Sequence, residues 1–517
     1  MTITSFYYLI FIAIGVVFYY LLPKSWQWVG LLILSIIFYY LAAVPFTIIY
    51  IVIQTLVAYI STIVIKKRRN KNCQDGTGLT VIFCCAVFLN FIFWFVLKGK
   101  GLWAPITSRL MHVVPFFSKV NNFLPVAALG MGYYTLQIIG YIIDCYWGNV
   151  EPQTNPFKLF LFVSFFPQLT AGPISRYSQL KTLYEKHFFS YQNLAFGAQR
   201  ILWGLCKKLI LAERIGDLLF RITSNLDTLT GFFSWVVILL YPLQMYADFS
   251  GCMDIVLGTA ELFDIHLVEN FNNPFFSRNS QEFWQRWHIT LGSWAKDYVM
   301  YPLLKSKAMI SLGKINRRRF GKRLGKFLTN AVGMFVLWMV MGIWHGGVHY
   351  LIGVSLWYWI VLMSGNLLEP YFEKLTDVLK IKTQSFSWHL FQSARTYLIY
   401  SVGAVIFSLG MRDGLRLLTD AVRVITVKDY ANPLIFFDGT FSFLEFSALD
   451  LNLLILMIFL LLVVGALREK YGYARVWIQN QGILFRWMLW IGLFLIVLLF
   501  GKYGPEYNAS SFIYQGF

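Results

Sequence analysis

The sequence predicts an all-α integral membrane protein with about 11–13 transmembrane or re-entrant helices. Of its 517 residues, 58% are hydrophobic and only 13% are charged. An ordinary soluble domain carries about 25% charged residues. The mean hydropathy of +0.60 points the same way. A water-soluble core could not bury this much apolar sequence, so the composition itself indicates a membrane protein.

Twelve apolar runs are candidates for these helices, because a spanning helix needs about 20 mostly apolar residues. They lie near residues 5–23, 27–43, 46–65, 79–97, 120–143, 159–175, 231–247, 327–345, 350–368, 396–411, 451–466 and 485–501. The shorter runs are the candidates for re-entrant segments. The first run lacks the basic flank and the small-residue cleavage site of a signal peptide, which predicts that it is retained as an anchor.

The net charge of +19 is concentrated in two short stretches. Residues 66–71 hold five of the 44 basic side chains, and residues 305–326 hold nine without an acidic residue among them. Both stretches are predicted to be short cytoplasmic loops beside apolar segments, which places Met1 on the outside. Such loops attract anionic lipid and could also attract a soluble acidic partner. Nucleic acid is not an expected partner.

Two segments in the middle of the chain are amphipathic. Residues 194–212 place apolar side chains on one helical stripe and Lys207 and Lys208 away from it, which predicts a helix in the membrane interface. Residues 279–301 repeat aromatic and apolar side chains at helical spacing, with Asn279 as the expected N-cap. We therefore expect two helices that do not cross the membrane as simple spans.

Two of the seven histidines, His288 and His345, lie in strongly apolar and aromatic surroundings. An ionisable residue at membrane depth is costly, and is for that reason a candidate functional residue. His345 closes an uncharged run, and Gly346 and Gly347 after it can end a helix through left-handed backbone angles. The alternative is a ring that is merely hydrogen-bonded near a helix end. Position alone leaves both interpretations open.

Imidazole suits acyl transfer to a hydroxyl, because a base with a pKa near neutrality can take the hydroxyl proton as the new bond forms. The sequence contains no G-x-S-x-G elbow, P-loop or dinucleotide-binding glycine pattern, so it indicates neither an acyl-serine nor a nucleotide fold. The two histidines stand 57 residues apart without an acidic ligand at metal spacing. We therefore expect no metal site.

Several sequence blocks carry a family resemblance. Residues 165–177 are similar to FFPxLxAGPIxRY, residues 246–251, 269–272 and 282–288 to YxDFSG, ENFN and EFWRRWH, and residues 342–346 to GxWHG. These patterns resemble the membrane-bound O-acyltransferase (MBOAT) family, in the bacterial branch with alginate O-acetyltransferase and the D-alanyl transfer protein of teichoic acids. Residues 511–514 also look like the end of alginate-type members. We expect a single MBOAT-type membrane domain over residues 1–517, with its motif-bearing core at about 120–415.

The resemblance implies a ring of tilted helices around a tunnel that joins a cytoplasmic donor site to an outer acceptor site. His345 matches the histidine regarded as catalytic in the family, and His288 matches the second histidine, on the acyl tunnel. Trp284 and Gly292 stand at i−4 and i+4 of His288, so one helical face is expected to offer an aromatic wall, an imidazole and a gap. We expect these two residues and Trp344 to line the passage of the donor.

Asp297 lies in a Trp-Ala-Lys-Asp-Tyr sequence that is similar to the family's W-L-R-D-Y. It could hold a neighbouring cation or orient a ring, and a structural salt bridge is an equal alternative because buried acids are usually paired. Lys296 stands where the family usually has arginine, which removes a bidentate fork.

The resemblance implies a multi-pass O-acyltransferase of the bacterial cytoplasmic membrane. The acyl group, in the first place acetyl, would come from a cytoplasmic thioester such as acetyl-CoA. It would reach an exported or cell-surface polysaccharide directly or through a periplasmic or extracellular acetyltransferase partner. The alternative is D-alanyl transfer to teichoic acid from an acyl-carrier thioester. A more distant alternative is a transporter or lipid flippase, since Gly and Pro interrupt several helices; duplicated halves are missing from the sequence.

Overall fold

The computed structural model describes residues 1–70, 76–98, 128–225, 231–423 and 446–503. These residues are almost entirely helical, with one isolated bridge between Phe271 and Trp287 and no strand among them. Within this part of the chain nine helices are long and apolar enough to cross a membrane: Lys24–Ala42, Pro45–Arg69, Thr77–Lys98, Phe232–Leu262, Lys307–His345, Val348–Val378, Phe386–Val422, Ala448–Tyr471 and Ile483–Phe500. Phe6–Leu21 is a shorter apolar helix. The all-α membrane class is confirmed, and the chain is a multi-pass membrane protein.

The predicted span at residues 159–175 is wrong. The segment divides into α8 (Pro156–Ser164) and α9 (Phe166–Leu169), because Phe165 leaves helical angles at φ −51° and ψ 111°. Pro167 lies in the first turn of α9, where its missing N–H costs no helical hydrogen bond. Of the run at 120–143, the first part lies outside the described residues and the rest belongs to α7 (Met131–Trp147).

The helices divide into two compact units. The first comprises Met1–Gly204 with Cys252–Glu269. It holds α1 (Phe6–Leu21), α2 (Gln27–Ala42), α3 (Ile48–Asn70), α4 (Gly76–Lys98), α7, α8, α9, most of α10 (Tyr191–Leu205) and the end of α12 (Phe232–Leu262). Phe166 lies in its core, with ring centroids 5.8 Å from Phe38 and 5.7 Å from Phe263. Residues 165–177 therefore build the core of this unit.

The second unit comprises Leu205–Gly251 and the described residues from Asn270 onward. Its elements are the π-helix η4 (Cys206–Ala212), α11 (Glu213–Thr223), the first part of α12, η5 (Pro274–Phe276), α13 (Ser280–Arg286), α14 (Ile289–Ala295), η6 (Lys296–Met300), α15 (Tyr301–Leu304), α16 (Lys307–His345), α17 (Val348–Tyr350), η7 (Leu351–Leu356), α18 (Trp357–Val378), α19 (Phe386–Arg423), α22 (Ala448–Tyr471), α23 (Ala474–Gln479) and α24 (Ile483–Phe500). The structure divides into two units, and the predicted single membrane domain over residues 1–517 stays a prediction. The predicted ring of helices around a tunnel also stays a prediction. Residues 511–514 lie outside the described residues.

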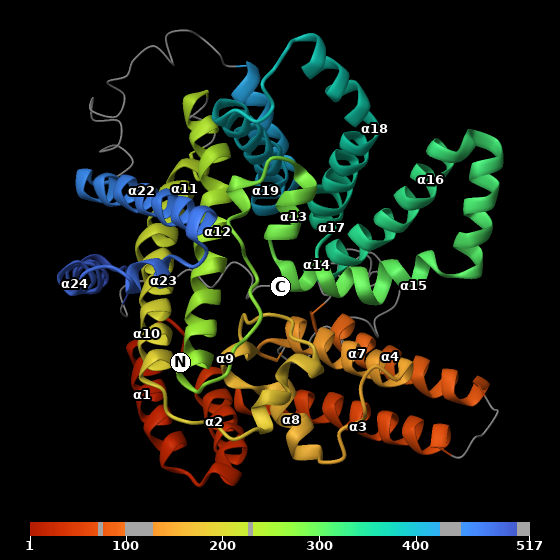
Figure 1. Cartoon of the computed structure of the whole chain (residues 1–517), viewed down its shortest axis with the longest axis vertical. Helices are drawn as coiled ribbons and strands as arrows, with labels where there is room; N and C mark the ends of the chain where they lie inside the picture. The colour runs from red at the N-terminus through yellow and green to blue at the C-terminus, as the bar shows by residue number, and fades with distance from the viewer. Residues whose placement is uncertain (71–75, 99–127, 226–230, 424–445, 504–517) are drawn as a thin grey trace, which may run out of the picture. The chain divides into compact units, whose positions relative to one another are not determined.

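The basic stretch at residues 305–326 is helical from Lys307 onward, after a turn at Lys305 and Ser306, so the prediction of a loop is wrong for residues 307–326. Helix α16 bends sharply within this stretch, at Gly321, where φ is 77° (Figure 1). Glycine adopts this positive φ without the strain of a side chain, so the helix can turn back without a loop. The two arms pack together, and Asn316 Nδ2 donates to Thr329 Oγ1 at 3.2 Å. We call residues 307–330 the basic hairpin.

The other basic stretch, residues 66–71, belongs in its described part to the end of α3, and residue 71 lies outside the described residues. Its Lys66 pairs with Glu151, with Nζ and Oε2 2.7 Å apart. The prediction of a separate loop is therefore wrong for residues 66–70. The sidedness of both basic stretches, and of Met1, stays a prediction.

Residues 194–212 do not form one interfacial helix. Helix α10 ends inside this segment, and the chain continues as η4, whose seven residues are all buried. Lys207 Nζ donates to Ser250 Oγ at 2.8 Å, and Lys208 Nζ lies 2.6 Å from Asp248 Oδ1. The interfacial prediction is wrong for these two lysines, because polar groups on α12 stabilise their ammonium groups away from water.

Candidate functional site

His345 is the last residue of α16, and the next residue reverses the backbone. Gly346 adopts φ +86°, and its N–H donates to the Ile343 carbonyl at 2.9 Å. This confirms the predicted helix end at Gly346. Gly347 is extended, at φ −136°, and precedes α17 instead. The His345 imidazole is buried and meets the Phe407 ring of α19 edge to face, at 5.4 Å between centroids.

His288 lies at a turn between two short helices. The helix predicted over residues 279–301 is interrupted here, since α13 ends two residues before His288 and α14 begins directly after it. The prediction of a continuous helix is therefore wrong, whereas Asn279 is confirmed as the N-cap and accepts the N–H of Glu282 at 2.8 Å. His288 has φ +46°, which is uncommon for any residue except glycine. Strained backbone of this kind concentrates at functional sites.

The side chain of Asn270 holds this turn in place. Its Oδ1 accepts the backbone N–H of Thr290 at 3.1 Å and the Thr290 hydroxyl at 2.9 Å, and lies 3.2 Å from Nδ1 of His288. The Asn270 carbonyl accepts the N–H of Ile289 at 3.0 Å. His288 lies outside the nine candidate spans. Burial of its ring, together with the nearby His345 imidazole, holds the pKa of His288 well below the usual range. The ring is therefore neutral near neutral pH.

One indole lies between the two histidines. The Trp344 ring centroid is 6.1 Å from that of His288 and 4.9 Å from that of His345, and both contacts are edge to face. Phe249 of α12 also meets His288 edge to face, at 4.9 Å. The structure thus brings together two imidazoles that stand 57 residues apart in the sequence.

A cavity of about 1140 Å³ opens beside His288 within the second unit. Trp284, His288 and Gly292 all line it, and its use as a donor passage stays a prediction. They do so because the chain turns at His288, and not because they share one helical face. Trp344 and His345 are not among the described residues that line the cavity, so it reaches the first histidine alone.

The walls of the cavity differ in chemistry. Towards the interior, the Trp284 ring meets Trp338 edge to face at 4.8 Å, beside the buried side chains of Leu337 and Met341. A Cβ added to Gly292 would have its nearest described neighbour, the Trp284 carbonyl oxygen, 3.8 Å away, so a methyl group would fit there in ordinary van der Waals contact. This part of the cavity suits a thin apolar group.

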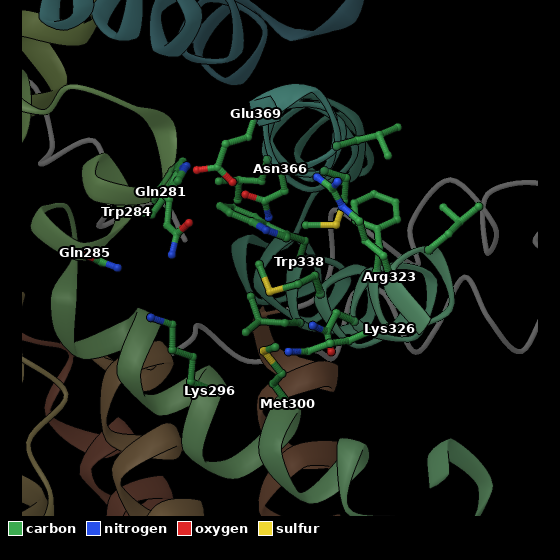
Figure 2. Close-up of a pocket in the computed structure, with 18 of the residues that line it drawn as sticks. Gln281, Trp284, Gln285, Lys296, Met300, Arg323, Lys326, Trp338, Asn366 and Glu369 are labelled. Carbon is green, nitrogen blue, oxygen red and sulfur yellow. The ribbon is translucent and has the colours of Figure 1, made fainter. Parts of the chain in front are cut away.

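The open side of the cavity is basic. Figure 2 shows Lys296 across the cavity from Arg323 and Lys326 of α16, and these last two are exposed. With Lys322, four cationic side chains line the cavity against one carboxylate, that of Glu369. Such a site favours an anionic ligand, and phosphate groups in particular.

Asp297 does not share the environment that was predicted for it. It is exposed on η6 and not buried, and its predicted roles, a cation partner, a ring-orienting group or a structural salt bridge, stay predictions. Its neighbour Lys296 lines the cavity.

One buried ionic group near the site was not predicted. Lys208 Nζ lies 2.6 Å from Asp248 Oδ1 and 2.7 Å from Glu213 Oε1, and all three side chains are buried. Asp248 directly precedes Phe249, which contacts His288. The one sequence signal was the acid in the block at residues 246–251, whose lysine partner is 40 residues away in the chain.

Comparisons with known proteins match this arrangement to one family. Residues 151–376 match the model of the membrane-bound O-acyltransferase family, MBOAT. The chain is 30% identical over 305 residues to a probable alginate O-acetylase of Pseudomonas syringae pv. tomato, which covers 59% of this chain and 52% of that protein. It is 30% identical over 257 residues to a peptidoglycan O-acetyltransferase of Helicobacter pylori, with 44% and 45% covered. It is 26% identical over 296 residues to a teichoic acid D-alanyltransferase of Bacillus subtilis, with 54% and 70% covered. The chain thus spans about half the length of the two acetylating relatives.

Proposed function

We propose, from the premise that this chain belongs to the membrane-bound O-acyltransferase family, that it transfers an acyl group from a thioester to a hydroxyl. The proposed donor is acetyl-CoA in the cytoplasm. The proposed acceptor is an exported or cell-surface polysaccharide, reached directly or through a partner acetyltransferase outside the membrane. The similarity to a probable alginate O-acetylase of Pseudomonas and to a peptidoglycan O-acetyltransferase of Helicobacter supports this choice.

The observation that carries the proposal is the pair of buried imidazoles packed on Trp344, with a cavity that reaches His288. Acyl transfer to a hydroxyl needs a neutral base close to the carbonyl, and histidine is the side chain most often used for this purpose. His345 ends a long apolar helix and is packed between aromatic rings. We therefore assign the base to His345 and the wall of the donor passage to His288.

In the proposed step, the acceptor oxygen attacks the carbonyl carbon of the thioester while His345 takes the hydroxyl proton. The new C–O bond forms and the C–S bond breaks. The leaving thiolate then receives the proton from the His345 imidazolium, which restores the neutral ring. General-base assistance of this kind contributes a factor of about 10²–10⁴ in rate.

The cavity supports a phosphate-bearing thioester as the donor. Its volume of about 1140 Å³ is slightly above the usual range of small-molecule sites, which is roughly 300–1,000 Å³. The cations at the opening suit phosphates, and the aromatic interior beside Trp284 and Gly292 suits the narrow arm that ends in the acyl group. Coenzyme A and a carrier-bound phosphopantetheine share this chemistry.

The second candidate function is D-alanyl transfer to teichoic acid from a carrier-protein thioester. The observation in its favour is the Bacillus subtilis relative, of which 70% of the length is matched. The two functions are separated by the donor. Purified protein in proteoliposomes is given either radiolabelled acetyl-CoA or a D-alanyl carrier thioester, and label on an oligosaccharide acceptor is counted.

We expect label from acetyl-CoA with the unaltered protein and none with His345→Asn. Label from the D-alanyl carrier alone would establish the second function instead. Label from neither donor, on the oligosaccharide or on an added partner acetyltransferase, with protein that is folded and correctly inserted, would overturn acyl transfer by this chain.

A further inference from the structure

Asn270 contacts three consecutive residues at the turn that carries His288. Its Oδ1 accepts from the backbone N–H and the hydroxyl of Thr290, its carbonyl accepts from Ile289, and Oδ1 lies 3.2 Å from Nδ1 of the His288 ring. We propose that Asn270 is a positioning residue that fixes the tautomer of His288, with the proton on Nδ1 and the lone pair on Nε2.

The orientation of the Asn270 amide follows from its partners. The backbone N–H of Thr290 can only donate, so the atom 3.1 Å from it is an acceptor. A flipped amide would set its NH₂ group against that N–H, two donors facing each other in a buried place, which is costly. The atom beside His288 is therefore an oxygen.

The tautomer of His288 follows in turn. An amide oxygen has no proton to give, so the contact with Nδ1 at 3.2 Å is a hydrogen bond only if Nδ1 carries the proton. A neutral imidazole has a single ring proton, and Nε2 then keeps its lone pair. Asn270, Phe249 and Trp344 contact the ring, and the titratable neighbour is His345. Burial beside that neighbour keeps the ring neutral.

This assignment limits what His288 does in the cavity. With its lone pair on Nε2, the ring accepts an N–H or O–H from a ligand, and it does not donate to a thioester carbonyl oxygen. The identity of the ligand group rests on the proposed function. On that function, the groups that fit as donors to Nε2 are the amide N–H groups of a pantetheine-type arm or the acceptor hydroxyl. Stabilisation of the charged oxygen in the transition state must then come from another group.

A purely structural role for Asn270 is the competing explanation. Its Oδ1 accepts from residues at the start of α14, as an ordinary cap would. The tautomer of His288 separates the two explanations, and Asn270→Asp tests whether residue 270 lies beside Nδ1 without loss of the cap, because aspartate is an equally good cap acceptor and has the same shape. Its carboxylate beside Nδ1 would raise the titration midpoint of His288 by roughly 1 to 3 pH units. A cap that makes no hydrogen bond to Nδ1 leaves the His288 tautomer unset, so both tautomers would appear in the unaltered protein.

The experiment is nitrogen NMR of the full-length protein labelled with ¹⁵N-histidine, in lipid nanodiscs, with the His288 signals identified by their loss in His288→Gln. In the unaltered protein at pH 8 we expect Nδ1 of His288 to carry the ring proton and Nε2 to be unprotonated. Asn270→Asp is expected to keep this tautomer and to move the titration midpoint upwards. Asn270→Ala is expected to admit the other tautomer. Thr290→Val removes a different hydrogen bond to the same oxygen and is expected to leave the tautomer unchanged.

A protonated Nε2 in the unaltered protein would overturn the inference, as would an unshifted His288 titration in Asn270→Asp. If Asn270→Ala does not fold, the unaltered protein and Asn270→Asp still decide the question. No acyl donor is needed for these spectra. The inference about Asn270 and the proposed function can therefore fail separately.

Discussion

The ammonium of Lys208 lies 2.6 Å from Oδ1 of Asp248, and both side chains are buried. The same ammonium lies 2.7 Å from Oε1 of Glu213, so it is held between two carboxylates. Asp248 is followed by Phe249, whose ring meets His288 edge to face at 4.9 Å. The ionic group therefore anchors the segment of α12 that packs against His288.

Lys208→Ala is predicted to destabilise the protein by about 3–5 kcal/mol, because it leaves two buried carboxylates without their cation. The free energy of unfolding in detergent is the measurement. Arg221→Ala is the matched control, since its pair with Asp217 is partly exposed (30% and 34%) and such pairs contribute about 0–1 kcal/mol. Equal losses in the two variants would contradict the anchoring role of Lys208.

His345→Asn is predicted to abolish acyl transfer, while the protein accumulates in the membrane at a normal level. Asparagine keeps polarity and some hydrogen bonding, but its amide does not take a proton near neutral pH. Acylation at the cell surface and protein abundance are measured together. His389→Asn, at the start of α19, is the control and should keep its activity. Substantial transfer by well-expressed His345→Asn would rule out the base assignment.

The stability of the protein is predicted to fall in acid partly through His288. In the unfolded chain the pKa of histidine is about 6.5, and in the folded protein burial and His345 hold the pKa of His288 well below this. Between these two values the unfolded chain binds a proton that the folded protein does not. The free energy of unfolding therefore has its full value above about pH 6.5 and decreases as the pH falls below it.

The measurement for His288 is the melting temperature between about pH 8 and pH 5. His288→Gln is expected to show a shallower decrease in acid than the unaltered protein. His266→Gln, at an exposed histidine, should leave the slope unchanged. A slope in His288→Gln equal to that of the unaltered protein would mean that this ring does not stay neutral in the fold.

Gly292→Leu is predicted to weaken binding of coenzyme A at least tenfold, because the new side chain would fill the space beside Trp284. Gly292→Ala should bind almost normally, since the added Cβ would have 3.8 Å to its nearest described neighbour. Gly492→Leu, on α24, adds the same bulk with nothing described within 4 Å of the Cβ, and is the control. Unchanged affinity in both Gly292→Leu and His288→Ala would show that the donor does not use this cavity.

Arg323→Ala is predicted to raise the KM for acetyl-CoA several-fold at low salt, with a smaller effect on kcat. Arg323 lines the open side of the cavity, and an exposed cation loses influence as salt screens it. The ratio of the two KM values should therefore shrink at high ionic strength. Arg318→Ala is the matched control, because Arg318 is exposed on the same basic hairpin but is not among the cavity's lining residues. Equal effects of the two variants would indicate general attraction and not a phosphate site.

The features that could be predicted from the sequence have local causes. The end of α16 at His345 follows from an uncharged run and a glycine that takes a positive φ, and both lie within a few residues of it. The N-cap at Asn279 has its partner three residues away. Local patterns of this kind need no knowledge of the fold.

The features that were missed depend on distant contacts or on a single residue. The apolar spacing of residues 279–301 continues through His288, yet the helix breaks there because Asn270, 18 residues earlier, binds the turn. The lysines of η4 look interfacial until α12 supplies their acceptors. The basic hairpin has the composition of a loop. The reversal of the helix takes place at one residue, Gly321.

Helix α16 joins the basic hairpin to His345, and this continuity fixes a length. From Arg323 to His345 the helix advances 22 residues, which at 1.5 Å each is roughly 33 Å. On the proposed function, this helix would act as a ruler between the hairpin, where the phosphates of the donor would bind, and the His345 imidazole. Removing one residue from this stretch would shorten the ruler by about 1.5 Å and turn His345 by about 100° relative to the hairpin. Selection among thioesters by the length of the arm is thus a property that a single helix can encode.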